Sequence, residues 1–336
     1  MKRKISYIFL IYILTLMPKS IATSEQTIEE QKSTFEINKF IDESKEYINN
    51  DFLKEDDLNN LLNSAIRGKV NNRNILAKVF SLFGKEFKNS IGTLSSILAI
   101  IVIHSILKSI SESLENENIA KLIYYVQYIL IVTIVMTNFS EIILMIKTSI
   151  ENMVGFINIL IPLLTTLMVF TGSITTTSIV QPVVLFSVNF LGNIIKTVII
   201  PIVLAAASLS IISKISDRIQ IDRLAKLLKS GVGWFLGIGL TVFVAIVSLE
   251  GTLSSSVDGI SAKTTKAVVS SAIPIVGKIL GDAVDSILGC GIILKNAIGI
   301  VGVVIILGIC IGPILKLALA MLSYKVIARC VSTYRR

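Results

Sequence analysis

The chain has 336 residues, of which 53% are hydrophobic and only 16% are charged. Soluble globular domains carry roughly 25% charged residues, so this composition indicates an integral membrane protein rather than a soluble enzyme. The net charge of +9 is spread over short gaps between apolar segments, which argues against a nucleic-acid-binding surface on one domain. Three cysteines, one histidine (His104) and no CxxC motif leave no basis for a disulfide framework or a zinc site.

The first residues are typical of a secretory signal peptide. Residues 2–4 are basic, residues 5–17 form an apolar stretch of thirteen residues, and the small residues Ser20 and Ala22 come next, where a signal peptidase would cut. The apolar stretch is short for a spanning helix, which needs about 20 residues. We therefore predict a signal peptide over residues 1–22; an uncleaved anchor is the alternative, and either would export the region that begins at residue 23.

Residues 23–88 form the water-soluble part of the chain. Their apolar residues recur at intervals of three and four, which predicts helices. Between residues 25 and 57 there are eleven acidic residues against four lysines. A region of this length can form a small extracytoplasmic helical subdomain, but its core would be thin.

The end of this region has the pattern of a basic amphipathic helix. One face carries Leu76, Val79, Phe80, Phe83 and Phe87, and the lysines of residues 78–88 lie elsewhere. Such a helix can lie in the lipid headgroup layer just before the first span. It can equally pack its apolar face on the rest of the subdomain, and the sequence leaves both interpretations open.

Seven apolar segments come next and are candidate transmembrane helices. They are residues 91–107, 122–140, 153–171, 178–195, 197–213, 232–250 and 297–322. Their lengths are close to those needed to cross a bilayer. We therefore predict an all-α polytopic membrane domain over residues 89–336, with about seven transmembrane helices.

The basic residues orient these spans. The loop 214–231 contains five basic residues against two acidic ones, and the tail after residue 322 contains four more basic residues. By the positive-inside rule both should be cytoplasmic, and seven crossings from an exported N-terminal region give the same result. The basic stretch 67–88 runs against the rule, which is weaker for long translocated segments. We expect a multi-pass cell-membrane protein with its N-terminal region outside and its C-terminus in the cytoplasm.

Residues 251–296 do not have the pattern of a simple span. The first part is rich in serine and threonine, and the second, apolar part is interrupted by Lys278, Asp282 and Asp285. Their spacing of four and three residues places these three charges on one face of a helix. The segment is predicted to be a re-entrant or amphipathic helical region, or a pair of crossings that lines a wet space.

No enzyme motif is present: the sequence has no P-loop, no HExxH and no nucleophile elbow, so neither catalysis nor a cofactor is expected. The informative residues are the polar ones within apolar segments. A charge near the bilayer centre costs about 2.5–3.5 kcal/mol and normally faces protein or water. These residues are Glu141, Gln181, Asn189, Lys196, Glu250, Lys278, Asp282, Asp285, Lys295 and Lys316.

Simpler explanations exist for several of them. Glu141 and Glu250 end predicted spans and would lie at the membrane interface. Lys196 lies near a predicted turn, from which its long side chain can reach the interface. Gln181 and Asn189 are best explained as hydrogen bonds between helices.

Small residues and prolines suggest close packing or bending in the C-terminal region. Gly277 and Gly281 are four residues apart, a spacing that lets helix backbones approach closely. Pro274 and Pro313 are candidate hinge positions. We therefore expect these four residues to serve helix packing or hinge bending.

The C-terminal half resembles a known family. The residues that carry the resemblance are 263–266, 273–278, 282–285, 288–289 and 295–302, with 248–251 before them and 312–316 after them. They are similar to stage III sporulation protein AE of endospore-forming Firmicutes. The likeness covers roughly residues 90–330 and is most specific over 248–316, whereas the exported region looks abbreviated.

The resemblance implies a place in the mother-cell membrane around the engulfed forespore. It implies a channel or transport complex with other stage III A-operon proteins, including an ATPase-like subunit, and a direct or indirect link to forespore stage II sporulation protein Q. The lipid bilayer is a further partner, and nucleic acid is not. On this interpretation Glu250, Lys278, Asp282, Asp285 and Lys295 line the conducting or assembly-critical region. A stand-alone secondary transporter and a non-conducting scaffold remain the alternatives.

Overall fold

The computed structural model describes residues 24–48, 52–70, 72–113, 117–215, 222–245, 248 and 276–334, and this described part contains helices and no β-strand. The predicted all-α class is confirmed. The predicted signal peptide over 1–22 lies outside the described residues, as do Glu250 and Pro274.

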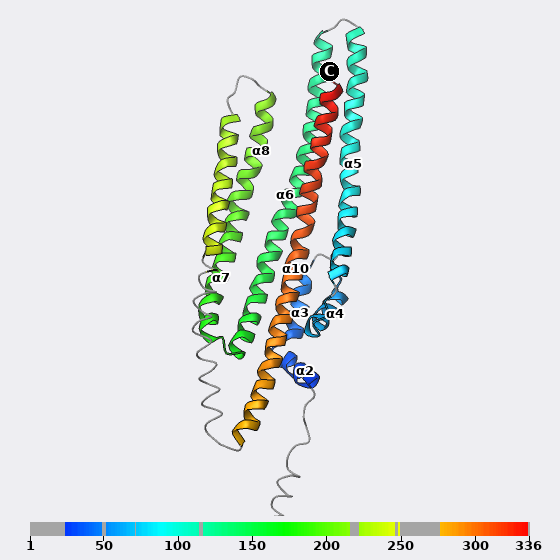
Figure 1. The fold of residues 1–336 in the computed structure, drawn as a ribbon. Helices are drawn as coiled ribbons and strands as arrows, with labels where there is room; N and C mark the ends of the chain where they lie inside the picture. The colour runs from blue at the N-terminus through cyan, green and yellow to red at the C-terminus, as the bar shows by residue number, and fades with distance from the viewer. Residues whose placement is uncertain are drawn as a thin grey trace, which may run out of the picture.

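Short helices come first and long helices come after them. The short elements are α2 (Ser24–Thr34), α3 (Ile37–Ser44), a 3₁₀ turn (Lys45–Tyr47) and α4 (Glu55–Ile66). The long ones are α5 (Asn72–Ser113), α6 (Glu117–Phe170), α7 (Ile174–Ile194), α8 (Ile200–Ile215), a helix Asp222–Ala245 and α10 (Val276–Tyr334). The long helices run side by side, and the end of α5, the start of α6, the end of α8 and the end of α10 point to the same end of the molecule (Figure 1).

Among the described residues, five helices are long and apolar enough to cross a membrane. The seven predicted spans fall on these five: 122–140 and 153–171 both lie in α6, and 178–195 and 197–213 lie in the continuous run from α7 to α8. The predicted break at 141–152 is absent because that stretch contains charges but no glycine or proline to end a helix. With 54 and 59 residues, α6 and α10 are about 80–90 Å long, far more than the roughly 30 Å hydrocarbon core.

The predicted turn near Lys196 is a change of helix type rather than a break. Residues Ile195–Ile199 form a π-helical turn between α7 and α8. Pro201 comes just after this turn and has no amide hydrogen to donate to the carbonyl four residues earlier. A wider turn accommodates this missing hydrogen bond while the chain continues in the same direction.

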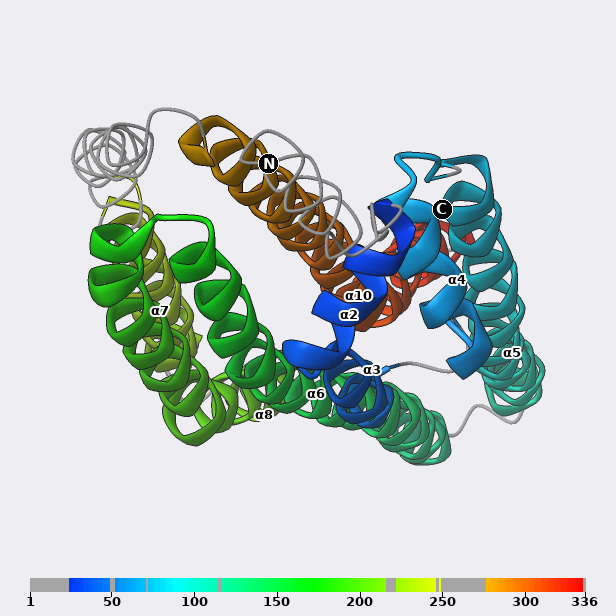
Figure 2. The same ribbon diagram turned by 90° about the horizontal axis from the view of Figure 1, so that it is seen from below.

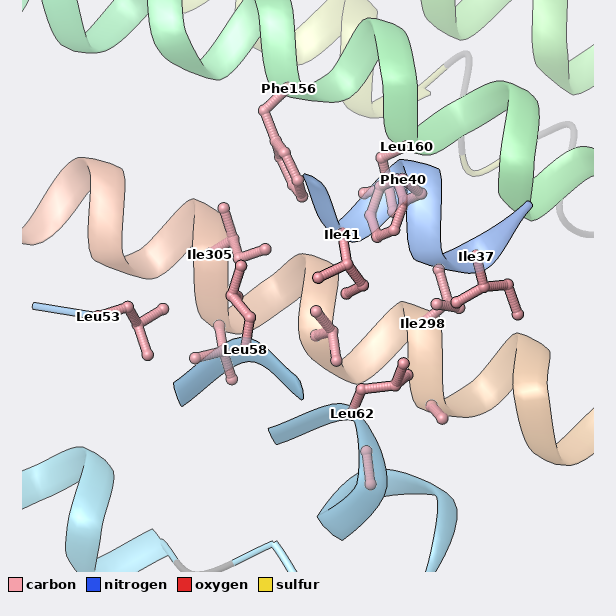
Figure 3. Packing of buried hydrophobic residues seen from close by; sticks show 14 of the residues in the cluster. Ile37, Phe40, Ile41, Leu53, Leu58, Leu62, Phe156, Leu160, Ile298 and Ile305 are labelled. Carbon is pink, nitrogen blue, oxygen red and sulfur yellow. The ribbon is translucent and has the colours of Figure 1, made fainter. Parts of the chain in front are cut away.

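The region predicted as a thin-cored subdomain is docked on the long helices. Apolar side chains of α3 and α4 are buried together with side chains of α6 and α10 in one shared cluster. Figure 3 shows Phe40 beside Phe156 and Leu160 of α6, and Leu58 beside Ile305 of α10. The short helices thus complete their core by covering one side of α10 between residues 294 and 309.

The start of α5 has two apolar faces. Ile75, Val79 and Leu82 pack on the shared core, whereas Phe80 and Phe83 are exposed. The helix continues without interruption past residue 88 into the first predicted span. If the start of α5 lay flat in the headgroup layer, the helix would have to bend near residue 88 to enter the membrane. The structure therefore matches the interpretation in which this helix packs on the short helices. The face that carries Phe80 and Phe83 remains uncovered.

The helix α6 connects the two sides of the molecule. It contacts α5 and α10 on one side and α7 and α8 on the other. Seen along the helix axes in Figure 2, α6 lies between these two groups.

The region predicted as re-entrant is helical from Val276 onward. The structure has one continuous helix from there to Tyr334, so a hairpin turning between residues 276 and 296 is excluded. Glycine is frequent in this part of the sequence and favours a turn, but α10 continues through its glycines and through Pro313.

Candidate functional site

Three polar pairs join α6 to the helical run that begins with α7. Lys196 Nζ lies 3.2 Å from Glu151 Oε1. The amides of Asn158 and Asn189 donate to each other at 3.2 and 2.8 Å. The Thr165 hydroxyl lies 3.2 Å from Gln181 Oε1. We call these six residues the polar ladder.

The spacing of the polar ladder follows from antiparallel helix packing. On α6 the three residues are seven positions apart (151, 158 and 165), and their partners run in the reverse order (196, 189 and 181). Seven residues are close to two helical turns, so residues seven apart on α6 lie on one face and meet the same neighbouring helix. Between the rungs, Gly192 packs so closely that a Cβ placed on it would lie 2.5 Å from Cγ2 of Val154.

The polar ladder is open along one edge. The side chains of Lys196 and Glu151 retain 30% and 43% of their accessibility, and Asn189 is exposed, whereas Thr165 is buried. These groups lie within helices apolar enough to span a membrane. Polar pairs in such helices fix register and are worth about 0.6–2 kcal/mol each. Partly exposed charges there require water or a protein neighbour rather than lipid.

A second set of polar pairs joins α6 to the C-terminal half of α10. Asn138 donates to the hydroxyl of Tyr324 at 2.9 Å, and Lys316 Nζ lies 3.8 Å from Glu141. At about 100° per residue, Asn138 lies about 140° and Glu141 about 80° around α6 from Glu151. The two sets therefore hold α6 between its two groups of neighbours.

These contacts decide several sequence-based interpretations. Gln181 and Asn189 do bond between helices, as predicted. Glu141 does not end a helix: it lies inside α6 and faces Lys316. Lys196 faces Glu151 instead of reaching to an interface from a turn. The sequence interpretation missed the α6 partners, although their seven-residue spacing was the signal that could have revealed them.

The three charged residues predicted to share a helix face fall within α10. Lys278, Asp282 and Asp285 occupy positions on one side of α10, and Asp285 is exposed. Lys295 is half-buried and lies about 100° of helix rotation away from Lys278, so it does not share that face. Glu250 lies outside the described residues.

The short N-terminal helices reach this part of α10. The buried Gln31 of α2 donates from Nε2 to the backbone carbonyl of Ile287 at 3.0 Å. Ile287 lies between Asp285 and Lys295 in sequence. The predicted assembly region therefore lies beside the N-terminal helices.

Glycines of α10 allow close packing, as the sequence suggested for this region. A Cβ on Gly302 would lie 2.7 Å from a Leu160 methyl carbon, and one on Gly291 would lie 2.7 Å from the Phe170 ring. The proposed pair Gly277 and Gly281 lies in the first turns of α10, and Pro313 is buried within it. In the part of the chain that the structure describes, no cluster of three or more metal-ligating side chains is found.

Residues 57–332 match the family model described as Stage III sporulation protein AE. The chain belongs to this family. Among curated proteins, Stage III sporulation protein AE of Bacillus subtilis (strain 168) is 28% identical over 253 residues, which cover 75% of this chain and 63% of that relative. The chain thus spans less than two thirds of the length of the relative. No solved structure matches it.

The family match confirms the resemblance found in the C-terminal half and extends it. The matched range includes both partners of every rung of the polar ladder and the whole of α5. It begins within α4, so the acidic helices α2 and α3 precede it. The shared part of the family is therefore the set of long apolar helices.

Proposed function

We propose that this chain is a membrane-embedded component of a channel or transport complex between mother cell and forespore, required for forespore development. Membership of a stage III sporulation family supports this proposal, as do the long apolar helices of the described residues. The observation that carries it is the polar ladder, whose charged rung of Glu151 and Lys196 stays partly exposed between apolar helices. In the complex this edge faces a hydrated path or a polar partner.

The orientation that suits this function places the basic end of the molecule in the cytoplasm. Lys121 lies near the start of α6, Arg223 at the start of the helix Asp222–Ala245, and Lys325 and Arg329 near the end of α10. These helix ends point to the same end of the molecule (Figure 1). Basic residues at one end of a set of spans favour the cytoplasmic side. The short helices then lie on the side of the space between the two membranes.

The assembly region belongs to that outer side. Asp285 and Lys295 flank the point where α2 contacts α10. Together with Glu250, Lys278 and Asp282 they offer charges for exported partner proteins. The partners that fit are other stage III A-operon proteins, an ATPase-like subunit at the cytoplasmic end, and forespore stage II sporulation protein Q.

A deletion strain of the spore-forming host tests the function. The readout is a reporter gene that is switched on late inside the engulfed forespore. We expect engulfment to proceed and reporter signal to be lost, with recovery when the intact gene is returned. Normal reporter expression and normal spores would refute the proposed role.

Two variants then separate a conduit from a scaffold. Asp282→Asn with Asp285→Asn removes two charges, and Glu151→Lys with Lys196→Glu reverses the ladder rung while keeping its ion pair. A conduit keeps its partners on co-purification but loses reporter signal. A scaffold loses co-purification with the aspartate variant and tolerates the ladder exchange. Substrate flux without partners in a heterologous membrane would instead favour a stand-alone transporter.

A further inference from the structure

The outer face of α5 is apolar and uncovered. Leu76, Phe80, Phe83 and Phe87 are 56%, 72%, 42% and 49% exposed, and the rings of Phe83 and Phe87 stack with centroids 6.0 Å apart. We call these four residues the α5 ridge. Contiguous exposed aromatic surface on a helix marks an interaction site.

The spacing of the α5 ridge is that of a helix-packing seam. Its members are separated by four, three and four residues, the alternation that keeps one stripe facing a neighbouring helix. The opposite face of the same turns is already occupied, because Ile75, Val79 and Leu82 pack on the shared core. The ridge is therefore a second seam with no neighbour among the described residues.

Lipid headgroups do not account for the α5 ridge. From Leu76 to Phe87 the helix rises about 17 Å, whereas one headgroup layer is roughly 5–8 Å deep. The same turns carry Arg73, Lys78, Lys85, Glu86 and Lys88, too many charges for the hydrocarbon core. The ridge thus belongs in the aqueous space next to the membrane, where a protein surface must cover it.

The chain itself offers a matching surface. A groove of about 340 Å³ lies between α3 and α6. Phe35, Phe40, Ile159, Pro162 and Leu163 give it an apolar floor, and the exposed Glu36 and Glu43 lie along its α3 side. The structure gives Glu43 no partner among the described residues, and Glu36 has only the exposed Lys39 at 3.3 Å.

The charges of the two surfaces are opposite. Lys85 and Lys88 are exposed beside the α5 ridge, whereas two of the three charged residues lining the groove are glutamates. Complementary charges around an apolar contact orient the partners and disfavour the like-with-like arrangement. Ridge against ridge would place lysines opposite lysines, so an isologous dimer is disfavoured.

We propose that the α5 ridge of one copy of this chain docks into the α3–α6 groove of a second copy. Because ridge and groove share no residue, each copy can use both, which makes the contact head-to-tail. Such contacts close into rings when the rotation between copies allows it. The inference rests on the extracytoplasmic placement of the short helices in the proposed function and adds self-assembly on that side.

Cysteine cross-linking between two differently tagged full-length copies tests the contact. One copy carries Phe83→Cys and the other Leu163→Cys, and both are produced in a bacterial host that lacks sporulation proteins. With Cys290, Cys310 and Cys330 replaced by alanine in both copies, a short bis-maleimide should join the two tags only when both introduced cysteines are present. A cross-linked product between two Phe83→Cys copies would overturn the proposal. A chain that remains monomeric would also overturn it, and would mean that a different protein covers the ridge.

Charge reversal makes the test specific. Lys85→Glu with Lys88→Glu in the first copy should lower the heterotypic product about tenfold, because like charges then face each other. Adding Glu36→Lys with Glu43→Lys to the second copy should restore it, which also shows that both variants fold. Lys325→Glu, at the other end of the molecule, is the matched control and should have no effect. Failure of the exchange to restore the product would count against the groove as the partner surface.

The same cysteine separates this inference from the proposed function. In copies that also carry Lys85→Glu and Lys88→Glu, which leave the ridge undocked, an impermeant maleimide should label Phe83→Cys from outside intact cells. Labelling without the heterotypic product would refute self-assembly and leave the proposed orientation standing. If the maleimide labels this cysteine only after the membrane is permeabilised, the proposed orientation itself is refuted.

Discussion

Gly308 of α10 lies against the ring of Phe52: a Cβ placed on Gly308 would lie 2.5 Å from Cδ1 of that ring. Phe52 is 3% exposed and lies between the 3₁₀ turn Lys45–Tyr47 and α4, so it belongs to the short N-terminal elements that dock on the long helices. The absence of a side chain at position 308 lets this segment contact α10 directly. Docking of the short helices therefore depends on a glycine more than 250 residues away in sequence.

Replacing Gly308 with alanine should weaken this docking. The added methyl group overfills the contact, which typically costs about 1–3 kcal/mol. Replacing glycine with alanine also stabilises the helix itself by about 1 kcal/mol. The control must therefore be another glycine-to-alanine substitution in the same helix. Gly299→Ala provides it, because a Cβ there meets nothing within 4 Å. Limited proteolysis of the full chain in detergent should cut the short helices faster in Gly308→Ala than in Gly299→Ala. Equal cutting rates would show that Phe52 moves aside at no cost.

The middle rung of the polar ladder should show coupling. Asn158→Leu or Asn189→Leu alone leaves one amide without its partner and should destabilise the chain by about 0.6–2 kcal/mol. The double variant leaves no orphan amide, so much of that loss should return. Thermal unfolding in detergent measures the cycle. Additive losses would mean that the two amides do not act as a pair in solution.

The same double variant bears on function. If the rung only holds α6 to α7, a stable double leucine variant supports normal forespore reporter expression. If the open edge of the ladder faces a hydrated path, stability returns and reporter expression does not. The two readouts together therefore distinguish structural support from contact with a transported solute.

Composition and periodicity are enough for the class of protein but not for the number of helices. A low charged fraction and long apolar runs predict an all-α membrane protein, and the structure agrees. The cost of a charge in lipid makes Glu141 and Lys196 candidate ends of spans when only the sequence is considered. Each faces an opposite charge on a distant part of the chain, so the helix continues through it. Sequence periodicity cannot show that pairing.

The site is partly predictable for a related reason. Helical spacing shows which residues share a face but not what covers that face. It places Val79 and Phe80 on one apolar surface of the amphipathic helix, whereas in the structure Val79 faces the core and Phe80 faces outward. Asn189 and Gln181 are recognisable as bonding residues because a lone amide in an apolar helix needs a partner. The identity of those partners depends on the antiparallel register of α6 and α7.

Gly192 should control the approach of α7 to α6. Alanine at this position would place a methyl group 2.5 Å from Cγ2 of Val154, a β-branched side chain with little rotamer freedom. We expect a loss of about 1–3 kcal/mol in thermal unfolding of the full chain. Val154→Ala removes the obstructing methyl group, so the double variant should recover most of the loss that Gly192→Ala adds. Without such recovery, the contact between these two residues would not be the cause.

The ion pair of Asp57 and Lys78 should make docking of α4 on α5 sensitive to acid. Lys78 Nζ donates to Asp57 Oδ2, and the amide of Lys54 donates to the same oxygen at 3.2 Å. The hydrogen bond from Lys78 is the largest cause that holds the pKa of Asp57 below its usual range. Because the pKa of this carboxyl group is lower in the folded state, its charge stabilises the fold at pH values above the unfolded-state pKa of about 3.9. This contribution is lost as the pH falls through the lower folded-state pKa.

Asp57→Asn removes this pH-dependent contribution. Both side chains are about one third exposed, so the loss at neutral pH should be no more than about 1 kcal/mol. The gap in unfolding temperature between wild type and Asp57→Asn should be constant from pH 8 to pH 5 and close below about pH 4, where the wild-type carboxylate takes up its proton. Lys78→Met removes the partner and should shrink the gap at every pH. A gap that persists unchanged at pH 3 would mean that the variant acts by altering packing, and that the carboxylate charge contributes nothing to docking.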